Sequence, residues 1–151
     1  RNGALDNPEH CDDGNNAAND GCSATCTIEG DADKCPTGVE IDLTAKGIWI
    51  SDTTTGKNTN NDTQCGGNSA GDVVYRVVPA QSGTVKFDLT GSFDKVLSMR
   101  NNCGDTGPVD FCTNSTMNIS ETHAVTANQA FHVVVTGMGG SEGNFVLHMY
   151  Y

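Results

Sequence analysis

Thr84-Val85-Lys86-Phe87-Asp88-Leu89-Thr90 is the stretch of sequence that decides the fold. Apolar and polar side chains alternate along it, so that Val85, Phe87 and Leu89 share one face while charged side chains take the other. A period of two residues is typical of a β-strand with one buried and one solvent-facing side. We therefore expect this segment to be a strand that covers a hydrophobic core.

The same alternation returns on both sides of this stretch. It predicts further strands at residues 39–43, 47–51, 73–78, 96–100, 116–119, 123–126, 130–136 and 144–150. Turn-forming glycines and serines separate the segments, and no segment fits an amphipathic helix over more than two turns. Many short strands without helices favour two packed sheets. We predict an all-β fold, an antiparallel, jelly-roll-like β-sandwich.

The first 34 residues differ from the rest because they lack periodicity and contain only two large apolar side chains, Leu5 and Ile28. We predict a small disulfide-rich, loop-dominated module in residues 1–34, followed by the sandwich in residues 35–151. The module carries eight acidic residues and two basic ones, which is more than half of the net charge of −11. Such acidity disfavours nucleic acids and anionic membrane surfaces as partners. The sequence has no apolar run of about 18 residues, so no membrane insertion is expected.

Seven cysteines in a small, glycine-rich chain favour an oxidising compartment. The chain begins at Arg1 and contains no signal-peptide pattern, so we expect a mature fragment that is extracellular, secreted or on the cell surface. The odd number of cysteines means either that one thiol is left over or that its partner lies outside these 151 residues.

A dense set of oxygen-bearing side chains lies between Cys11 and Cys26. Ca²⁺ takes six to eight oxygen ligands, and glycines at positions 14 and 21 permit the tight turns that bring such ligands together. The alternative is that these side chains only cap turns. We predict calcium as a cofactor, with these metal ligands: Asp12, Asp13, Asn15 and Asp20.

The same segment resembles a known repeat. Its sequence Cys11-Asp12-Asp13-Gly14-Asn15, followed by Asp20-Gly21-Cys22-Ser23, Cys26 and Glu29, is similar to the cysteine-rich repeat of extracellular proteins in myxobacteria and their relatives. Members of that family open with a further cysteine followed by Gly-Asn-Gly. Because Arg1-Asn2-Gly3 stands in that place here, the resemblance implies a family cysteine just before Arg1. It also implies an extracellular spacer or adhesion module that binds calcium.

The remainder of the chain resembles the bacterial pre-peptidase C-terminal domain. The similar stretches are Gly71-Asp72-Val73-Val74-Tyr75-Arg76-Val77, Gly83-Thr84-Val85, Asp94 with Leu97, Phe131 to Gly137 and Gly143-Asn144-Phe145. The family carries Asp-Val/Trp-Tyr or Asp-Trp/Tyr-Tyr near its first core strand, and this chain departs from that pattern by one residue. The resemblance implies a non-catalytic β-sandwich attached to secreted hydrolases and surface proteins, some of which bind fibrous substrates or carbohydrate. It assigns no binding residue to this sequence.

The cysteines suggest a set of disulfides, although a sequence cannot fix their connectivity. Cys103 and Cys112 enclose a link rich in glycine and proline, which predicts a local bridge between them. Cys35 and Cys65 flank the first two sandwich strands and form a second predicted pair. The remaining three, Cys11, Cys22 and Cys26, belong to the module, with one of them paired to the absent family cysteine.

Three functions compete. The first is a non-catalytic extracellular structural or adhesion module that self-associates, or joins other surface proteins, in a repeat or filament. The second is a carbohydrate- or matrix-binding appendage of a secreted hydrolase, with Trp49, Tyr75, Tyr150 and Tyr151 as stacking surface. The third is a hydrolase with Ser69 as its nucleophile, because residues 67–71 fit Gly-x-Ser-x-Gly. It ranks last, since a nucleophile elbow needs a helix after the serine and a strand is expected there.

Overall fold

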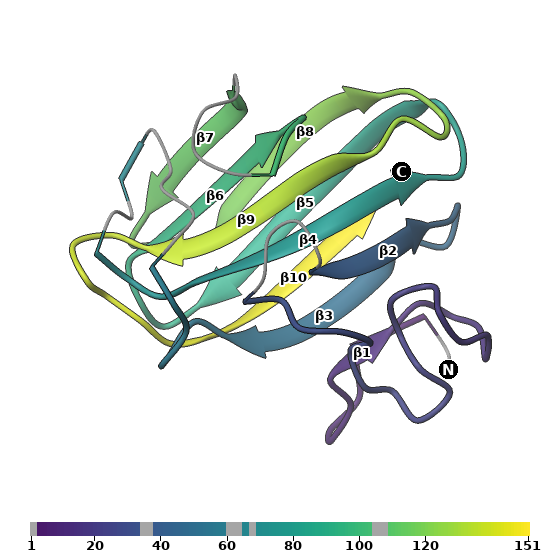
Figure 1. Cartoon of the computed structure of the whole chain (residues 1–151), viewed down its shortest axis with the longest axis horizontal. Coiled ribbons are helices and arrows are strands. Elements are labelled where there is room, and N and C mark those ends of the chain that lie inside the picture. Colours follow the sequence, from purple (N-terminus) through teal and green to yellow (C-terminus); the bar gives the residue numbers. More distant parts are fainter. Residues whose placement is uncertain (1–2, 34–37, 60–64, 67–68, 104–108) are drawn as a thin grey trace.

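Two five-stranded β-sheets pack face to face in this computed structural model, which describes residues 3–33, 38–59, 65–66, 69–103 and 109–151 (Figure 1). The strand order is β1-β3-β10-β5-β8 in the first sheet and β2-β4-β9-β6-β7 in the second. The bounds are Cys11–Asp12 (β1), Val39–Leu43 (β2), Ile48–Thr53 (β3), Asp72–Pro79 (β4), Gly83–Gly91 (β5), Lys95–Arg100 (β6), Val109–Ser115 (β7), Ile119–Val125 (β8), Phe131–Gly137 (β9) and Asn144–Tyr150 (β10).

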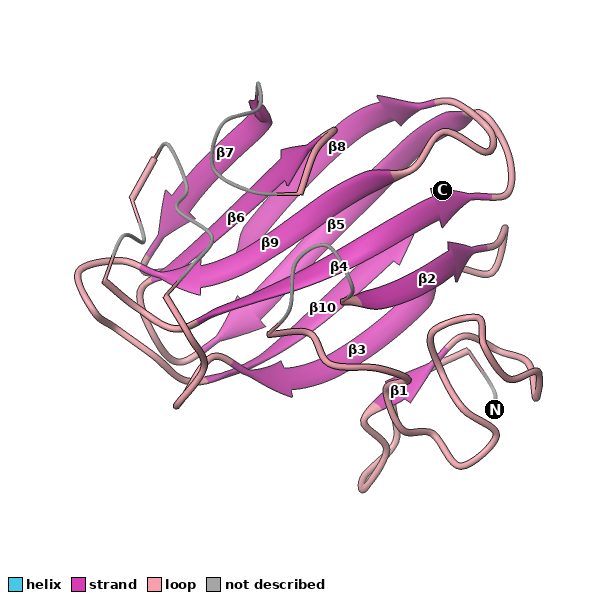
Figure 2. Ribbon diagram, in the orientation of Figure 1, coloured by secondary structure: helices cyan, strands magenta, loops and turns pink. Residues whose placement is uncertain are grey.

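Figure 2 shows strands joined by loops and turns, and no helix occurs in the described ranges. The predicted all-β sandwich is therefore confirmed. Consistently, the described part of the chain has no helix long and apolar enough to cross a membrane.

Strand β5 behaves as its alternation predicts. Val85, Phe87 and Leu89 are fully buried between the sheets. The Phe87 ring meets the Phe131 ring of β9, in the opposite sheet, with centroids 6.0 Å apart. Burial of an apolar side chain of this size contributes about 1.5–3 kcal/mol, so this layer is a large part of what holds the sheets together.

Strand β9 lies in the middle of the second sheet, and all seven of its residues are buried. Its inward face carries Phe131, Val133 and Val135, as the pattern predicts. The opposite face, with His132 and Val134, is also covered. Strand β9 is therefore buried on both faces, and a polar side chain there has to find its partners within the protein.

The region around residues 109–126 differs from the prediction. We expected a Gly/Pro-rich link up to residue 111 and short strands at 116–119 and 123–126. The structure instead has β7 at Val109–Ser115, a turn, and then β8 as one continuous strand. The expected break inside β8 does not exist because all seven of its residues pair with β5, from Ile119 opposite Leu89 to Val125 opposite Gly83.

Two further pairings were not expected. Strand β2 runs parallel to β4, with Val39 opposite Tyr75, whereas the prediction was purely antiparallel. In the N-terminal segment, for which no strand was predicted, Cys11 and Asp12 form β1 and pair with Ile50 and Trp49 of β3. The buried side chains of Cys11, Cys22 and Ala32 join the sandwich core. The N-terminal segment thus packs directly on the sandwich.

Candidate functional site

We call Asp12, Asp13, Asn15 and Asp20 the N-terminal acidic cluster. Asp12 and Asp13 are only 1% and 3% exposed, respectively. The Asn15 side-chain amide donates to Asp13 Oδ2 at 2.6 Å and to Asp20 Oδ2 at 3.0 Å, so one nitrogen joins two carboxylates. Asp12 Oδ1 instead accepts the Gly14 amide at 2.7 Å and closes a turn. The structure therefore brings together three of the four predicted ligands.

Negative charge in this cluster is only partly balanced. Burial raises the pKa of Asp13; the Asn15 backbone amide opposes that shift, and the nearby Asp20 carboxylate adds to it. Asp20 Oδ1 is buried without a hydrogen-bond partner among the described residues. Such a pair of carboxylates gains from a proton or from a cation bound between them.

The cluster fits calcium in its chemistry but not as a preformed cage. Ca²⁺ prefers six to eight oxygens, whereas no group of three or more His, Cys, Asp or Glu side chains in the described ranges is arranged to hold a metal ion. The Asn15 amide nitrogen occupies the position between Asp13 and Asp20, and Asn15 Oδ1 accepts the Ala17 amide at 2.5 Å. A cation between the two carboxylates would have to displace that amide. Calcium therefore stays a prediction.

The disulfides differ from those expected in the sandwich. Cys11 bonds to Cys22 within the module, and Cys65 bonds to Cys112. The predicted pairs Cys103–Cys112 and Cys35–Cys65 are therefore wrong. The reason is the unexpected strand β7: it carries Cys112 into a sheet edge beside residue 65, where the Asn114 side chain also donates to the Cys65 carbonyl at 2.9 Å.

The other cysteines divide into three cases. Cys103 is disulfide-bonded, and Cys35 lies outside the described residues. Cys26 carries a thiol, which donates to Glu9 Oε1 at 2.9 Å.

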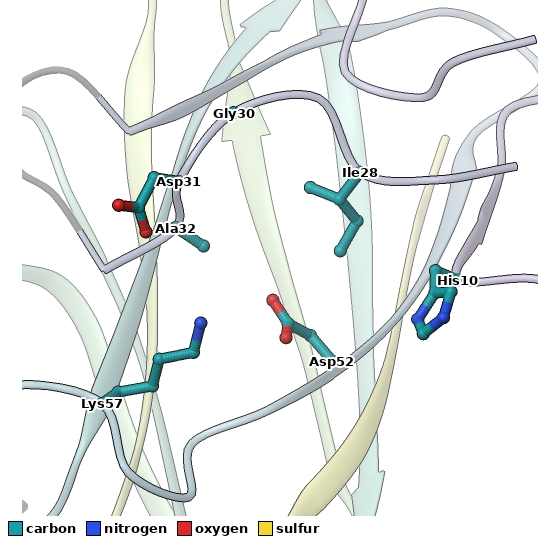
Figure 3. A pocket seen from close by; sticks show the side chains of 7 residues that line it. All are labelled: His10, Ile28, Gly30, Asp31, Ala32, Asp52 and Lys57. Carbon is teal, nitrogen blue, oxygen red and sulfur yellow. The ribbon is translucent and has the colours of Figure 1, made fainter.

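A cavity of about 240 Å³ lies at the junction between the N-terminal segment and the sandwich (Figure 3). His10 and Asp31 line it from the N-terminal side, and Asp52 and Lys57 line it from the sandwich side. In Figure 3 the Lys57 ammonium and the Asp52 carboxylate both point into this space. Sequence reasoning did not find this group, because its members come from four separate segments that only the packing of the module brings together.

Asp52 has a structural partner inside the sandwich. The Tyr75 hydroxyl, on the second sheet, donates to Asp52 Oδ2 at 2.9 Å, and the Thr53 amide donates to Oδ1 at 2.8 Å. Tyr75 is fully buried; burial and the Asp52 carboxylate together hold the pKa of its phenol well above the ordinary value. This phenol therefore stays protonated and works as a donor. Tyr75 also cannot offer a stacking surface, so that part of the prediction is wrong.

The outer face of the first sheet carries a row of stacked rings, Trp49, His148 and Tyr150, which we call the aromatic row. Trp49 lies opposite His148 in the sheet register, with ring centroids 3.7 Å apart and planes 8° from parallel. His148 stacks in turn on Tyr150, at 4.2 Å and 20°. Both faces of the imidazole are thus covered by protein. The sequence predicted Trp49 and Tyr150 as surface aromatics but missed the histidine between them, although His148 and Tyr150 share one face by their spacing of two residues.

Polar groups continue this row. Asp88 accepts hydrogen bonds from Tyr150 at 3.0 Å and from Ser120 at 2.6 Å, and it pairs with Lys86 at 3.3 Å. Burial raises the pKa of Asp88, but the three donors together lower it by more, so the pKa lies below its usual value. The Lys86 ammonium lies 5.6 Å from the Tyr150 ring centre, on a face that a sugar would otherwise use.

A basic row crosses the second sheet. His132 of β9 lies between Arg76 of β4 and Arg100 of β6 in the sheet register. Arg76 forms an ion pair with Glu40 of β2. Burial, followed by the two arginines, lowers the pKa of His132, although a hydrogen bond to the Asn101 backbone opposes the shift. His132 is therefore held in its neutral form.

Ser69 does not occupy a nucleophile elbow. It lies in an exposed turn, and strand β4 begins at Asp72, where an elbow would continue into a helix.

Comparison with known proteins gives a match to the fold. No family model matches the sequence, and no curated protein matches it. Among solved structures, the crystal structure of the pre-peptidase C-terminal domain of a collagenase from Bacillus anthracis matches with a TM-score of 0.51 and 12% sequence identity. The match covers 73% of this chain and 91% of that one.

The two chains share a fold. At 12% identity the likeness concerns the fold alone, and it confirms the predicted pre-peptidase C-terminal-like sandwich at that level. The resemblance of residues 1–35 to the myxobacterial repeat remains a prediction.

Proposed function

We propose that this chain is a non-catalytic extracellular module that attaches or spaces other parts of a secreted or surface protein assembly and associates with copies of itself. The observation that carries the proposal is the sandwich fold shared with a pre-peptidase C-terminal domain of a collagenase. Domains of that type are non-catalytic appendages of secreted hydrolases. The buried disulfide between Cys11 and Cys22 agrees with folding in an oxidising compartment.

The environments of two carboxylates, Asp52 and Asp88, support the same proposal. The Asp52 carboxylate is hydrogen-bonded to a buried phenol, and the Asp88 carboxylate is held ionised by three donors. The pKa of Asp88 is lowered, whereas a general acid at neutral pH needs a raised one. Both act as anchors between strands.

The test measures the oligomeric state of the chain by sedimentation velocity and by negative-stain electron microscopy. Both measurements are made with 2 mM CaCl₂ and with EDTA. Protein concentrations in sedimentation extend from roughly micromolar to millimolar, the range in which weak interfaces associate. We expect oligomers or filaments. Dispersed monomers at every concentration, with and without calcium, would contradict self-association. Esterase or peptidase activity that disappears in Ser69→Ala would contradict the non-catalytic part.

Calcium binding is the second part of the proposal. The supporting observation is the pair formed by the buried Asp13 and the half-buried Asp20, which share one amide nitrogen, while Asp20 Oδ1 is buried without a hydrogen-bond partner among the described residues. We expect added calcium to raise the melting temperature through linkage and EDTA to reverse the rise, whereas Asp13→Asn abolishes the calcium effect. Asp6→Asn, which changes an exposed carboxylate outside the cluster, is the matched control. Identical melting curves with calcium and with EDTA would contradict the site.

A carbohydrate-binding role is the alternative, and the aromatic row is the observation that favours it. The geometry limits that role, because sugars stack on ring faces. In this row each imidazole face is taken by a neighbouring ring, and one face of Tyr150 is near Lys86. A glycan array compared between the native chain and Trp49→Ala tests this function. Binding that is lost in the variant would favour it over the structural role.

A further inference from the structure

The edges of the two sheets are not equally protected. Strand β1 covers β3, and the Ser51 amide of β3 donates to the His10 carbonyl. On the edge of β2, the Asp42 amide donates to the Asp20 carbonyl at 2.9 Å. On the edge of β7, the disulfide from Cys112 holds Cys65 against the strand. Three of the four sheet edges are therefore occupied by the N-terminal segment or by a tethered loop.

The fourth edge is β8, which borders the more distant sheet in Figure 1. Its seven residues pair with β5 on one side, and no strand among the described residues pairs with its other side. Proteins usually protect such an edge with lysine, proline or a bulge, because unpaired backbone amides and carbonyls recruit other strands. The sequence Ile119-Ser120-Glu121-Thr122-His123-Ala124-Val125 has neither residue type, and its register with β5 is unbroken.

We propose that β8 pairs antiparallel with β8 of a second copy of this chain, about a two-fold axis through Thr122. In this register Thr122 lies opposite itself, so the contact is isologous and closes as a dimer. Glu121 then lies opposite His123 of the other copy twice, which places an acceptor against a donor. Ile119 lies opposite Val125 twice, which pairs two β-branched side chains. Opposite-polarity, Thr–Thr and β-branched cross-strand pairs each stabilise an antiparallel ladder.

The surroundings of β8 fit the same register. Met117, just before β8, is 75% exposed, the more exposed of the two large apolar side chains that lie open in the described ranges. Met117 lies in the bend before β8 and Ala127 in the turn after it, so the antiparallel pairing brings the Met117 segment of one copy towards the C-terminal end of β8 in the other. There a pocket of about 180 Å³ opens beside the end of β8; its lining combines the apolar Met99, Ala124, Val125 and Phe131 with the polar Asn101, Asp110, His123, Thr126 and Gln129. The proposed pairing thus brings an exposed methionine to an open, partly apolar pocket.

This inference rests on the proposed self-association and names its contact. A pair of seven-residue strands is at the small end of specific interfaces, so we expect a dissociation constant in roughly the micromolar to millimolar range.

Cysteine cross-linking tests the register, because only a residue on the two-fold axis meets its own copy. Directly opposed side chains have Cβ atoms about 5 Å apart. We expect Thr122→Cys to form a disulfide-linked dimer under mild oxidation, with the 122–122 link identified by peptide mapping. Thr90→Cys is the matched control, because Thr90 is also exposed but lies on β5, which is paired on both sides; this variant stays monomeric on a non-reducing gel. In a mixture, Ser120→Cys and Ala124→Cys chains cross-link to each other and not to themselves.

Charge variants measured by sedimentation equilibrium give a second readout that does not depend on a new thiol. Glu121→Lys raises the dimer dissociation constant about tenfold, because it loses two cross-strand pairs. The exchange Glu121→His with His123→Glu restores the pairing and the native constant. Met117→Glu weakens the dimer, whereas Met138→Glu, at the other exposed methionine, does not.

Each variant is first checked for an unchanged melting temperature. Oligomers that persist while Thr122→Cys fails to cross-link overturn the β8 contact and leave self-association standing. A chain that stays monomeric at every concentration overturns both.

Discussion

Tyr75 and Asp52 join the two sheets through the interior of the sandwich, with the phenol of β4 donating to a carboxylate of β3 over 2.9 Å. Replacement of Tyr75 by Phe removes the donor and leaves a partly buried carboxylate with one partner fewer. We expect a loss of about 1–2 kcal/mol in the free energy of unfolding, measured by urea denaturation. Tyr151→Phe is the control, because its hydroxyl donates to the exposed Gln81 carbonyl at 3.0 Å and only at 3.4 Å to the partly buried Leu43 carbonyl; we expect a smaller loss than for Tyr75→Phe. Equal losses of stability in the two variants would contradict the larger contribution expected from the Tyr75–Asp52 hydrogen bond.

The Cys65–Cys112 disulfide closes a span of 47 residues. Restriction of the unfolded chain by a loop of that length is worth about 4 kcal/mol, so Cys65→Ser with Cys112→Ser should lower the unfolding free energy by nearly that amount. Cys26→Ser is the control, since it keeps a hydrogen-bond donor for Glu9 and breaks no disulfide.

Peptide mapping under non-reducing conditions checks the connectivity directly. We expect fragments that join Cys65 to Cys112 and Cys11 to Cys22. A fragment that joins Cys103 to Cys112 would instead support the local bridge predicted from the sequence.

His132 makes stability depend on pH. Its pKa in the folded chain lies below the unfolded value near 6.5, so the unfolded chain binds more protons between the two values. The stabilisation from neutral His132 is complete above about pH 6.5 and is lost as the pH falls towards the folded-state pKa. We expect the native chain to lose stability relative to His132→Gln between pH 7 and pH 5. Parallel pH profiles for the two chains would contradict this account.

Lys95 is a buried cation at the end of the sandwich. It is 0% exposed, and its ammonium donates to the Phe93 carbonyl at 3.0 Å. Burial lowers the pKa of this side chain, which means that the folded state resists its charge. Lys95→Met keeps the aliphatic chain and removes the charge, so we expect stabilisation by about 1 kcal/mol in thermal unfolding. Lys86→Met, on the outer face of β5, serves as the comparison and should not stabilise the chain, because this cation is not buried and pairs with Asp88. A destabilised Lys95→Met would show that the buried ammonium has a favourable role.

The sequence predicts a strand well where one face of the strand is buried and the other is exposed to solvent. β5 and β10 have that pattern, and their predicted bounds agree with the structure to within a residue. β7 was missed because its Val-Asp-Phe-Cys-Thr-Asn-Ser sequence lies at an edge where most side chains are half-buried, which erases the alternation. β1 was missed because two residues carry no period, and only pairing with β3 makes them a strand.

The candidate sites also differ in how far they could be predicted from the sequence. Local spacing brings Asp13, Asn15 and Asp20 together, and this neighbourhood was predictable from the loop sequence. The disulfide partners and the residues around the junction cavity depend on which distant strands lie side by side, and a single sequence does not contain that information.

Strand β10 has a consequence for the order in which the first sheet can form. It follows the other described strands in the sequence, yet it lies between β3 and β5 in the first sheet and pairs with both along its length. Before residues 144–150 pair with these two strands, the first sheet exists only as two separate halves, β1-β3 and β5-β8. The sheet therefore closes through contacts between segments that are far apart in the sequence, which is a slow kind of folding step.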